Sequence, residues 1–303
     1  MQGNQYTLRK SYYFEGKGLH TGTYSHMKLM PGPVDSGIVF RRTDLSSRPE
    51  IEAVAENVTN TARSTTISSN EAVAVTIEHI MSALTGLGVD NAVIELDNIE
   101  VPILDGSARP YLDAIMKDGL KKQDAPRRYI ELPQSLEIRD DKSGSWIRIE
   151  PSDSPSADIT VDFNSKILGV QRAHWDMHTD YAQEIGVCRT FVFFHEIEYL
   201  FRNNLIKGGD VDNAIVIVEH PASEQQLESI ARLFNMKELK ITDEGYLNNL
   251  NLHFPDECGR HKMLDLLGDI RLCGGYLNAR ISAYKPGHSI NTKAAKALRA
   301  MLK

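Results

Sequence analysis

One short pattern occurs twice in this chain, once in each half, and it restricts the folds open to it. Each copy places a histidine, a methionine and a leucine at helical spacing, followed by an Asn-Ala-x-Ile strand signal. The copies comprise His79, Met81, Leu84 with residues 91–94, and His261, Met263, Leu266 with residues 278–281. This repeat predicts two units of similar design, each presenting a histidine-bearing helix to a shared cleft.

Strand and helix signals mix in both halves, which predicts the α+β class with two layers in each domain. A length of 303 residues corresponds to about two domains. Residues 118–128 are polar and contain Pro126, so we interpret them as a linker. The expected domains are residues 1–125, which carry Glu78 and His79, and residues 126–303.

Local signals position several elements. Ser68-Ser69-Asn70 separates two β-branched runs and predicts a hairpin. Thr76 is expected to cap the helix that follows. Ser223 and Gln226 have the spacing of a capping box and predict an amphipathic helix over 223–234. The last helix is expected to begin near Asn291, which leaves His288 in the preceding loop.

Composition excludes several classes of protein. Charged residues make up 25% and hydrophobic residues 41%, as in ordinary globular chains. The net charge of −7 argues against nucleic acid as a partner, because such proteins need a basic face. No apolar run approaches the ~20 residues of a transmembrane segment, and the N-terminus resembles no signal peptide. With three cysteines in no paired motif, these features predict a cytoplasmic protein with reduced thiols.

The clearest chemical pattern is His261, Asp265 and Asp269, spaced four residues apart on one helical face. Imidazole and carboxylate are both good zinc ligands, so His261 and Asp265 could form a metal clamp. Taken alone, the row fits a solvated helix face with a surface His–Asp pair better.

A carboxylate and an imidazole, Glu78 and His79, adjoin within the otherwise apolar segment 72–87. Taken alone, the pair fits a buried histidine satisfied by its neighbour equally well. However, His79 would complete a three-ligand zinc site with His261 and Asp265, leaving a position open for water. Glu78 could then take the proton from that water.

Other residues allow two interpretations each. His288 and the glycine-flanked His20 are either functional loop histidines or ordinary surface histidines. The aromatic run 191–194 beside Thr190 is either a buried strand or an apolar passage for a long ligand.

Seven segments, in order along nearly the whole chain, resemble the UDP-3-O-acyl-N-acetylglucosamine deacetylases, zinc amidases of lipid A biosynthesis in Gram-negative bacteria. The segments are residues 18–22 (GLHTG), 77–84 (IEHIMSAL), 102–107 (PILDGS), 189–191 (RTF), 208–214 (GGDVDNA), 260–265 (RHKMLD) and 284–288 (YKPGH). Each is weak alone, and together they are specific.

The resemblance implies two domains of similar two-layer β/α sandwich topology, each with a small insert, and an active site between them. It implies that zinc is bound by His79, His261 and Asp265. Glu78 would be the general base that activates the zinc-bound water. His288, held protonated by Asp269, would stabilise the oxyanion and protonate the departing amine, and Thr190 would help to bind the oxyanion.

The resemblance also implies a set of substrate contacts. Lys262 and Lys285 would lie near the UDP diphosphate, with Phe163 and Asn164 at the nucleotide. Phe191 and Glu196 would lie near the sugar, and His20 is a further expected contact. The acyl chain would run through a tunnel in the second insert, for which the candidates are Ile197, Val211, Ala214 and Val216.

Several expectations concern partners and alternatives. Zinc is expected, with Fe²⁺ possible in the cell because availability also decides occupancy. Some members of the family are fused to a C-terminal hydroxyacyl-carrier-protein dehydratase, which is a possible partner here. The chain carries about twenty extra residues within 219–250, expected to pack on the outer face of the second domain. The alternatives are a binding module for a nucleotide sugar or acyl chain, with a structural four-ligand metal, and an RNA-binding module.

Overall fold

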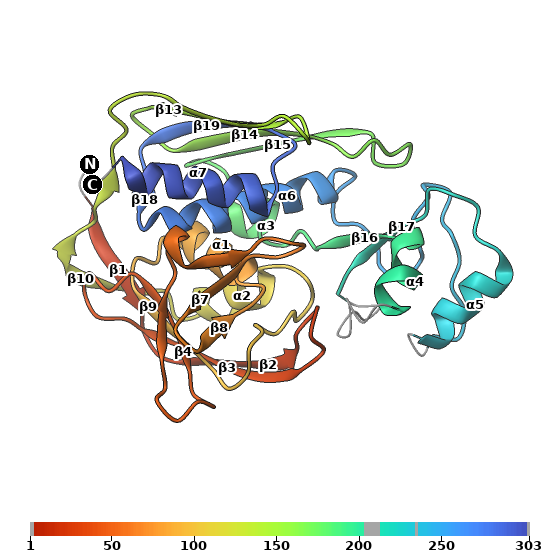
Figure 1. Cartoon of the computed structure of the whole chain (residues 1–303), viewed down its shortest axis with the longest axis horizontal. Helices are drawn as coiled ribbons and strands as arrows, with labels where there is room; N and C mark the ends of the chain where they lie inside the picture. Colours follow the sequence, from red (N-terminus) through yellow and green to blue (C-terminus); the bar gives the residue numbers. More distant parts are fainter. Residues whose placement is uncertain (1–2, 203–212, 234–235, 302–303) are drawn as a thin grey trace.

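The computed structural model describes residues 3–202, 213–233 and 236–301. Two five-stranded sheets lie on the outside, and helices from both halves fill the space between them (Figure 1). One hydrophobic core runs through these layers, with Phe40 and Ile94 from one sheet and Ile149 and Ile281 from the other. The α+β class is confirmed.

The first half contributes ten strands and two α-helices among the described residues. They are β1 (Asn4–Leu8), β2 (Tyr12–Lys17), β3 (Tyr24–Pro31), β4 (Ile38–Arg42), β5 (Glu50–Glu52), β6 (Val58–Asn60), β7 (Thr66–Ser69), β8 (Ala72–Ala74), α1 (Glu78–Leu87), β9 (Ala92–Leu96), α2 (Arg109–Met116) and β10 (Leu120–Pro126).

The second half repeats this plan with further helices. Its elements are β11 (Tyr129–Ile130), β12 (Leu136–Asp140), β13 (Ser145–Pro151), β14 (Ser156–Asp162), β15 (Val170–Asp176), α3 (Tyr181–Glu184), β16 (Phe191–Phe193), α4 (Phe194–Arg202), β17 (Ile215–Ile217), α5 (Glu224–Leu233), α6 (Glu257–Ile270), β18 (Tyr276–Leu277), β19 (Ala279–Tyr284) and α7 (His288–Ala300).

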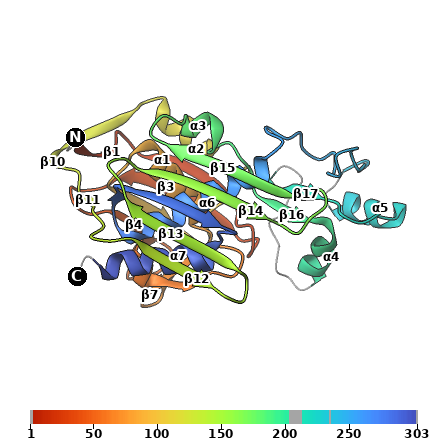
Figure 2. The same ribbon diagram turned by 90° about the horizontal axis from the view of Figure 1, so that it is seen from above.

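The two sheets have the same topology, as the sequence repeat predicts. Their strand orders are β2-β3-β9-β4-β5 and β12-β13-β19-β14-β15. In each sheet the strand that comes last in the sequence pairs parallel with one neighbour, β9 with β4 and β19 with β14, and antiparallel with the other. Figure 2 shows the second sheet from above, with α6 and α7 beneath it.

The repeated helices α1 and α6 pack directly on each other between the sheets (Figure 1). Gly268 makes this approach close, because a Cβ atom at that position would lie 2.2 Å from the carbonyl oxygen of Glu78. The expectation that the two histidine-bearing helices meet is therefore confirmed.

Each half carries a small addition to its sandwich. In the first half it is the sheet β6-β7-β8; in the second it comprises β16, β17, α4 and α5, which stand apart from the sandwich in Figure 1. The extra segment belongs to this second insert. Ile230 and Leu247 pack with Phe194, Ile197 and Val216 in its separate core, so the expected packing on the outer face of the domain was wrong.

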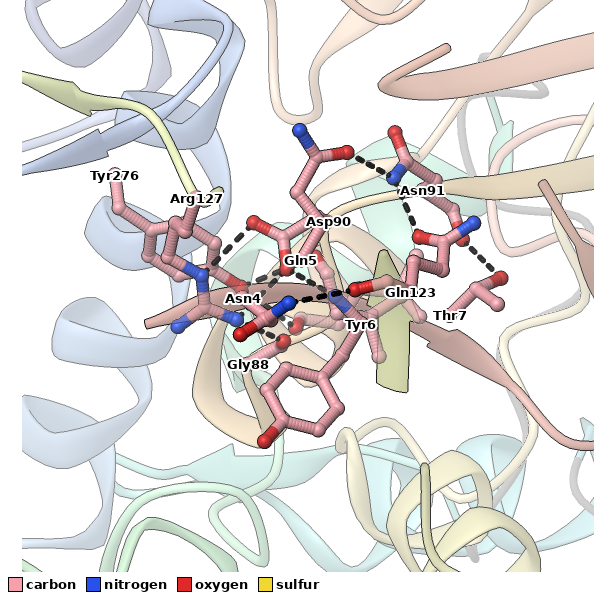
Figure 3. A network of polar contacts seen from close by, with 12 residues as sticks. Asn4, Gln5, Tyr6, Thr7, Gly88, Asp90, Asn91, Gln123, Arg127 and Tyr276 are labelled. Carbon is pink, nitrogen blue, oxygen red and sulfur yellow. Dashed lines mark hydrogen bonds and ion pairs between the residues drawn. The ribbon is translucent and has the colours of Figure 1, made fainter. Parts of the chain in front are cut away.

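Residues 118–128 are not a free linker. Leu120–Pro126 is strand β10, which pairs antiparallel with β1. The polar composition misled because a short pair of strands buries few side chains. Arg127 follows directly and joins the halves: its guanidinium binds both carboxylate oxygens of Asp90 at 2.9 and 2.8 Å and lies 4.3 Å from the centre of the Tyr276 ring (Figure 3). The domain boundary at 125/126 stays a prediction.

Two helix starts differ from expectation. Thr76 does not cap α1: its backbone has a left-handed φ of 60°, and its hydroxyl donates to buried Glu100 at 2.7 Å. α7 begins at His288, three residues earlier than predicted, so His288 lies in the first turn of a helix. The hairpin β7–β8 and the Ser223–Gln226 capping box are confirmed. None of the helices in the described ranges has the length and apolar content needed to cross a bilayer.

Candidate metal centre and active site

The structure brings His79, His261 and Asp265 together at the contact of α1 and α6. All three are buried, and their ligand atoms lie within 4.8 Å of one another. Nε2 of His261 is 3.4 Å and Nε2 of His79 is 3.8 Å from Oδ1 of Asp265. The imidazole rings meet edge to face at 5.0 Å. Residues 182 positions apart thus form one compact donor set.

The electrostatics of this set fit a bound cation. Burial and the neighbouring His261 lower the pKa of His79 to about 3, so its imidazole is neutral, as a metal ligand must be. Nδ1 of His261 hydrogen-bonds to the carbonyl oxygen of Cys188 at 3.0 Å, which leaves Nε2 as the donor atom.

Asp265 gives the most direct indication that this set of side chains fits a metal ion. Burial favours its neutral form, but Lys262 and the surrounding imidazoles outweigh burial and lower its pKa. Oδ2 accepts a hydrogen bond from Nζ of Lys262 at 2.8 Å. Oδ1, which faces the two imidazoles, is buried and has no hydrogen-bond partner in the described part of the chain. A buried, ionised oxygen without a partner is costly, and a metal ion would satisfy it.

Glu78 is the first residue of α1 and is only 3% exposed. Its Oε2 accepts a hydrogen bond from the backbone amide of Thr65 at 3.0 Å. Burial raises the pKa of Glu78 to about 7, with His288 opposing the shift and two aspartates adding to it. A carboxyl group with such a pKa can take up and release a proton near neutrality.

His288 and Asp269 form a buried pair beside the same site. Nδ1 of His288 lies 2.9 Å from Oδ2 of Asp269, and Nε2 lies 4.0 Å from Oδ2 of Asp265. Burial lowers the pKa of His288, but the charge of Asp269 and its hydrogen bond outweigh burial and raise it to about 9. His288 is therefore a cation at neutral pH, with its second nitrogen toward the metal-ligand set.

Sequence reasoning missed two residues at this pair. The Thr65 hydroxyl donates to Oδ1 of Asp269 at 2.5 Å, and the Asn291 amide donates to Oδ2 at 2.9 Å. Local patterns assign Thr65 to a strand and Asn291 to a helix start, and neither pattern indicates a distant carboxylate.

Thr190 lies in a segment tied to both halves. Its amide donates to the carbonyl of Gly106 at 2.8 Å. Gly106 has a φ of 80°, and a Cβ there would lie 2.0 Å from the carbonyl oxygen of Asn213, so only glycine allows this approach. The preceding Arg189 forms a buried ion pair with Glu257 at 2.9 Å, which fixes the segment against the start of α6.

Part of the expected substrate set also assembles next to His261. The ring of Phe191 lies 6.3 Å from the ring of His261 and 5.2 Å from the ring of Phe163. Nζ of Lys262 lies 5.4 Å from the centre of the Phe191 ring. Lys285 and Asn164 both contact a different residue, Asp162. Nζ of Lys285 lies 3.5 Å from Oδ2 of Asp162, whose Oδ1 accepts the amide of Asn164 at 3.0 Å.

The remaining expected contacts lie in other surroundings. His20 is in a loop whose amides, including its own at 3.0 Å, donate to buried Glu100. Glu196 is half-buried on α4. Of the tunnel candidates, Ile197 and Val216 are buried in the core of the second insert, Ala214 is half-buried, and Val211 lies outside the described residues. The tunnel and these contacts stay predictions.

Two histidines and an aspartate, beside a buried carboxyl group and a charged histidine, define the class of site found in metal-dependent hydrolases. Comparison of sequences identifies the family. The sequence model of the UDP-3-O-acyl N-acetylglycosamine deacetylase family matches residues 5–232 and 230–300, and the chain belongs to this family.

Similar curated proteins have two kinds of name. "Bifunctional enzyme LpxC/FabZ" of Porphyromonas gingivalis is 42% identical over 99% of this chain and 65% of its own length. The protein of the same name from Bacteroides thetaiotaomicron is 41% identical over 97% of this chain and 64% of its own length. "UDP-3-O-acyl-N-acetylglucosamine deacetylase" of Pseudomonas entomophila is 39% identical over 97% of this chain and 89% of its own length. The chain thus spans about 65% of the length of the first two relatives.

Proposed function

We propose that this chain hydrolyses the N-acetyl group of UDP-3-O-acyl-N-acetylglucosamine, giving acetate and UDP-3-O-acyl-glucosamine for lipid A biosynthesis. Family membership supports the substrate. The observation that carries the chemistry is the buried Oδ1 of Asp265, which lacks a hydrogen-bond partner in the described structure and faces two imidazoles. His79, His261 and Asp265 would hold zinc, which polarises a carbonyl and lowers the pKa of bound water to about 7.

Glu78 is the general base of the proposed reaction. Its carboxylate takes a proton from the attacking water as oxygen adds to the acetamide carbon. The amide of Thr65 keeps one carboxylate oxygen in place during this transfer. A carboxyl group with a pKa near 7 matches the task, because it accepts the proton readily and can also return it.

His288 supplies positive charge and then a proton. Its imidazolium stabilises the negative oxygen that forms on the acetamide carbon, and the hydroxyl of Thr190 assists. The amine is a poor leaving group until its nitrogen is protonated, so His288 donates its Nε2 proton there as the C–N bond breaks. Asp269 is a positioning residue that orients the ring through Nδ1 and favours its charged form.

The substrate contacts complete the proposal. Lys262 and Phe191 lie beside His261, where a lysine can bind the diphosphate and an aromatic ring can cover the sugar. Lys285, Phe163 and Asn164 are proposed for the nucleotide end, and Glu196 and His20 for the sugar. Ile197, Val211, Ala214 and Val216 are proposed for the acyl chain. Iron in place of zinc, a cytoplasmic location and fusion to a dehydratase stay predictions of the same kind.

The test is a mass-spectrometric assay with UDP-3-O-acyl-N-acetylglucosamine. We expect the zinc-loaded wild type to remove one acetyl group. The His79→Ala variant and a chelator-treated sample should lose this activity. Glu78→Gln should keep its zinc but turn over about 10²- to 10⁴-fold more slowly. A folded, zinc-loaded wild type that leaves the substrate intact would refute the proposal, and full turnover by Glu78→Gln would remove Glu78 from its role.

A further inference from the structure

Thr65 is hydrogen-bonded both to the proposed base, Glu78, and to Asp269, the partner of the proposed acid. It is fully buried, directly before β7. Its backbone amide donates to Oε2 of Glu78 at 3.0 Å, and its hydroxyl donates to Oδ1 of Asp269 at 2.5 Å. Its carbonyl accepts the amide of Ile77, the residue before Glu78, at 3.2 Å. One residue of the first half is therefore bonded to the base and to the partner of the acid.

The chemistry of these groups fixes the direction of each hydrogen bond. A carboxylate only accepts, so the Thr65 hydroxyl donates its single proton in a hydrogen bond to Oδ1 of Asp269. The other oxygen of Asp269 accepts from His288 and Asn291, at 2.9 Å in both cases. The Thr65 oxygen also lies 3.3 Å from Nδ1 of His288. This is longer than the 2.9 Å from Nδ1 to Asp269, so the proton on Nδ1 is donated mainly to Asp269. Nδ1 therefore carries a proton, and Nε2 is the nitrogen turned to the reaction.

Burial gives the Thr65 hydroxyl particular weight. Asp269 is 0% exposed, so water cannot replace a lost donor. Without the hydroxyl, one oxygen of the carboxylate would be unpaired in a dry interior, and the side chain would rotate toward its remaining donors, His288 and Asn291. Such a rotation would turn the imidazole bonded to the other oxygen.

We propose that Thr65 is a positioning residue that sets the distance and orientation between the general base Glu78 and the acid pair Asp269–His288. This inference rests on the proposed function. Thr65 touches neither the metal-ligand set nor the expected substrate residues through these bonds, so its hydroxyl acts on turnover rather than on binding of zinc or substrate.

Thr65→Val tests this proposal because valine has the shape of threonine without the hydroxyl and leaves the backbone amide in place. We expect kcat for UDP-3-O-acyl-N-acetylglucosamine to fall about 10- to 100-fold, with KM and bound zinc unchanged. Thr65→Ser keeps the hydroxyl and should restore kcat. Thr7→Val is the matched control: the buried Thr7 hydroxyl donates to the carbonyl of Asn91 at 2.7 Å in the network of Figure 3, remote from the site in sequence. It should lower Tm and leave kcat unchanged.

A second variant identifies the route of the effect. If the hydroxyl acts through Asp269, adding Thr65→Val to Asp269→Ala should lower kcat little further, because the acceptor is already gone. Full kcat in Thr65→Val, or a loss that Thr65→Ser does not restore, would overturn the inference while wild-type activity upholds the proposed function. If Thr65→Val does not fold, Thr65→Ser decides: a kcat far below that of the wild type overturns the inference. An inactive, zinc-loaded wild type would instead refute the proposed function.

Discussion

At the scale of single residues, the contrast between Glu78 and His288 organises the site. Both are buried, yet one is a carboxyl group with a pKa raised to about 7 and the other an imidazole with a pKa raised to about 9. Burial disfavours charge on both. Only His288 has a buried carboxylate bonded to it, and this partner reverses the effect of burial. The site can thus hold a base and a protonated acid together.

Replacing Asp269 by asparagine should shift the alkaline limit of activity. The substitution removes the negative charge that raises the pKa of His288, so His288 loses its proton at lower pH. We expect the alkaline limb of the kcat/KM profile to move down by about one to three pH units. The acid limb, assigned to Glu78, should move less, because the charges of Asp269 and His288 act on the pKa of Glu78 in opposite directions. Measured pH–rate profiles with matched zinc content check this, and an unmoved alkaline limb would contradict the role given to Asp269.

The metal-ligand candidates could be found from the sequence because their spacing and the repeat carry a signal. His261 and Asp265 share a helical face, and His79 occupies the repeated position of His261. The groups that support them could not be found. Cys188 acts through its carbonyl, which every residue possesses, and Thr65 meets Asp269 across 204 positions. The placement of such groups is decided by the packing of α1 on α6, which no local pattern specifies.

At the scale of elements, the close packing of α1 on α6 sets the positions of the proposed metal ligands relative to one another. We expect Gly268→Ala to force the helices apart, because its new Cβ would overlap the carbonyl of Glu78. The cost should be on the order of 1–3 kcal/mol of unfolding free energy, together with weaker zinc binding. Thermal unfolding and chelator competition measure the two effects. Wild-type zinc affinity in this variant would show that the ligand geometry tolerates the displacement.

The predicted elements were correct where neighbouring residues determine the structure, and wrong where contacts with residues far away in the sequence determine it. The Ser223–Gln226 capping box forms as expected, because both partners lie within one turn. Strand β10 was read as a linker, because its polar side chains conceal a backbone that pairs with β1, more than a hundred residues earlier. Thr76 has a side chain suited to a helix N-cap, but its hydroxyl donates a hydrogen bond to buried Glu100 instead.

At the scale of the whole molecule, the proposed ligand set draws His79 from the first half and His261 and Asp265 from the second. Zinc that binds only the folded arrangement stabilises it, by about 2.7 kcal/mol at a free concentration one hundred times the Kd. We expect a chelator to lower the Tm of the wild type by roughly 5 °C and zinc to restore it. In His79→Ala, the chelator should change Tm far less. Equal shifts in both proteins would show that stability does not depend on this site.

The repeat also bears on how the two helices at the site came to carry different side chains at equivalent positions. In a symmetric pair of identical units, every substitution would appear on both sides of the axis. Joining two copies in one polypeptide removes that constraint, and the equivalent positions have diverged: Ala83 corresponds to Asp265, Leu87 to Asp269, and Arg260 to Glu78, while the histidines remain matched. Broken symmetry would thus allow the first copy to supply the proposed base, Glu78, and the second copy the proposed acid, His288.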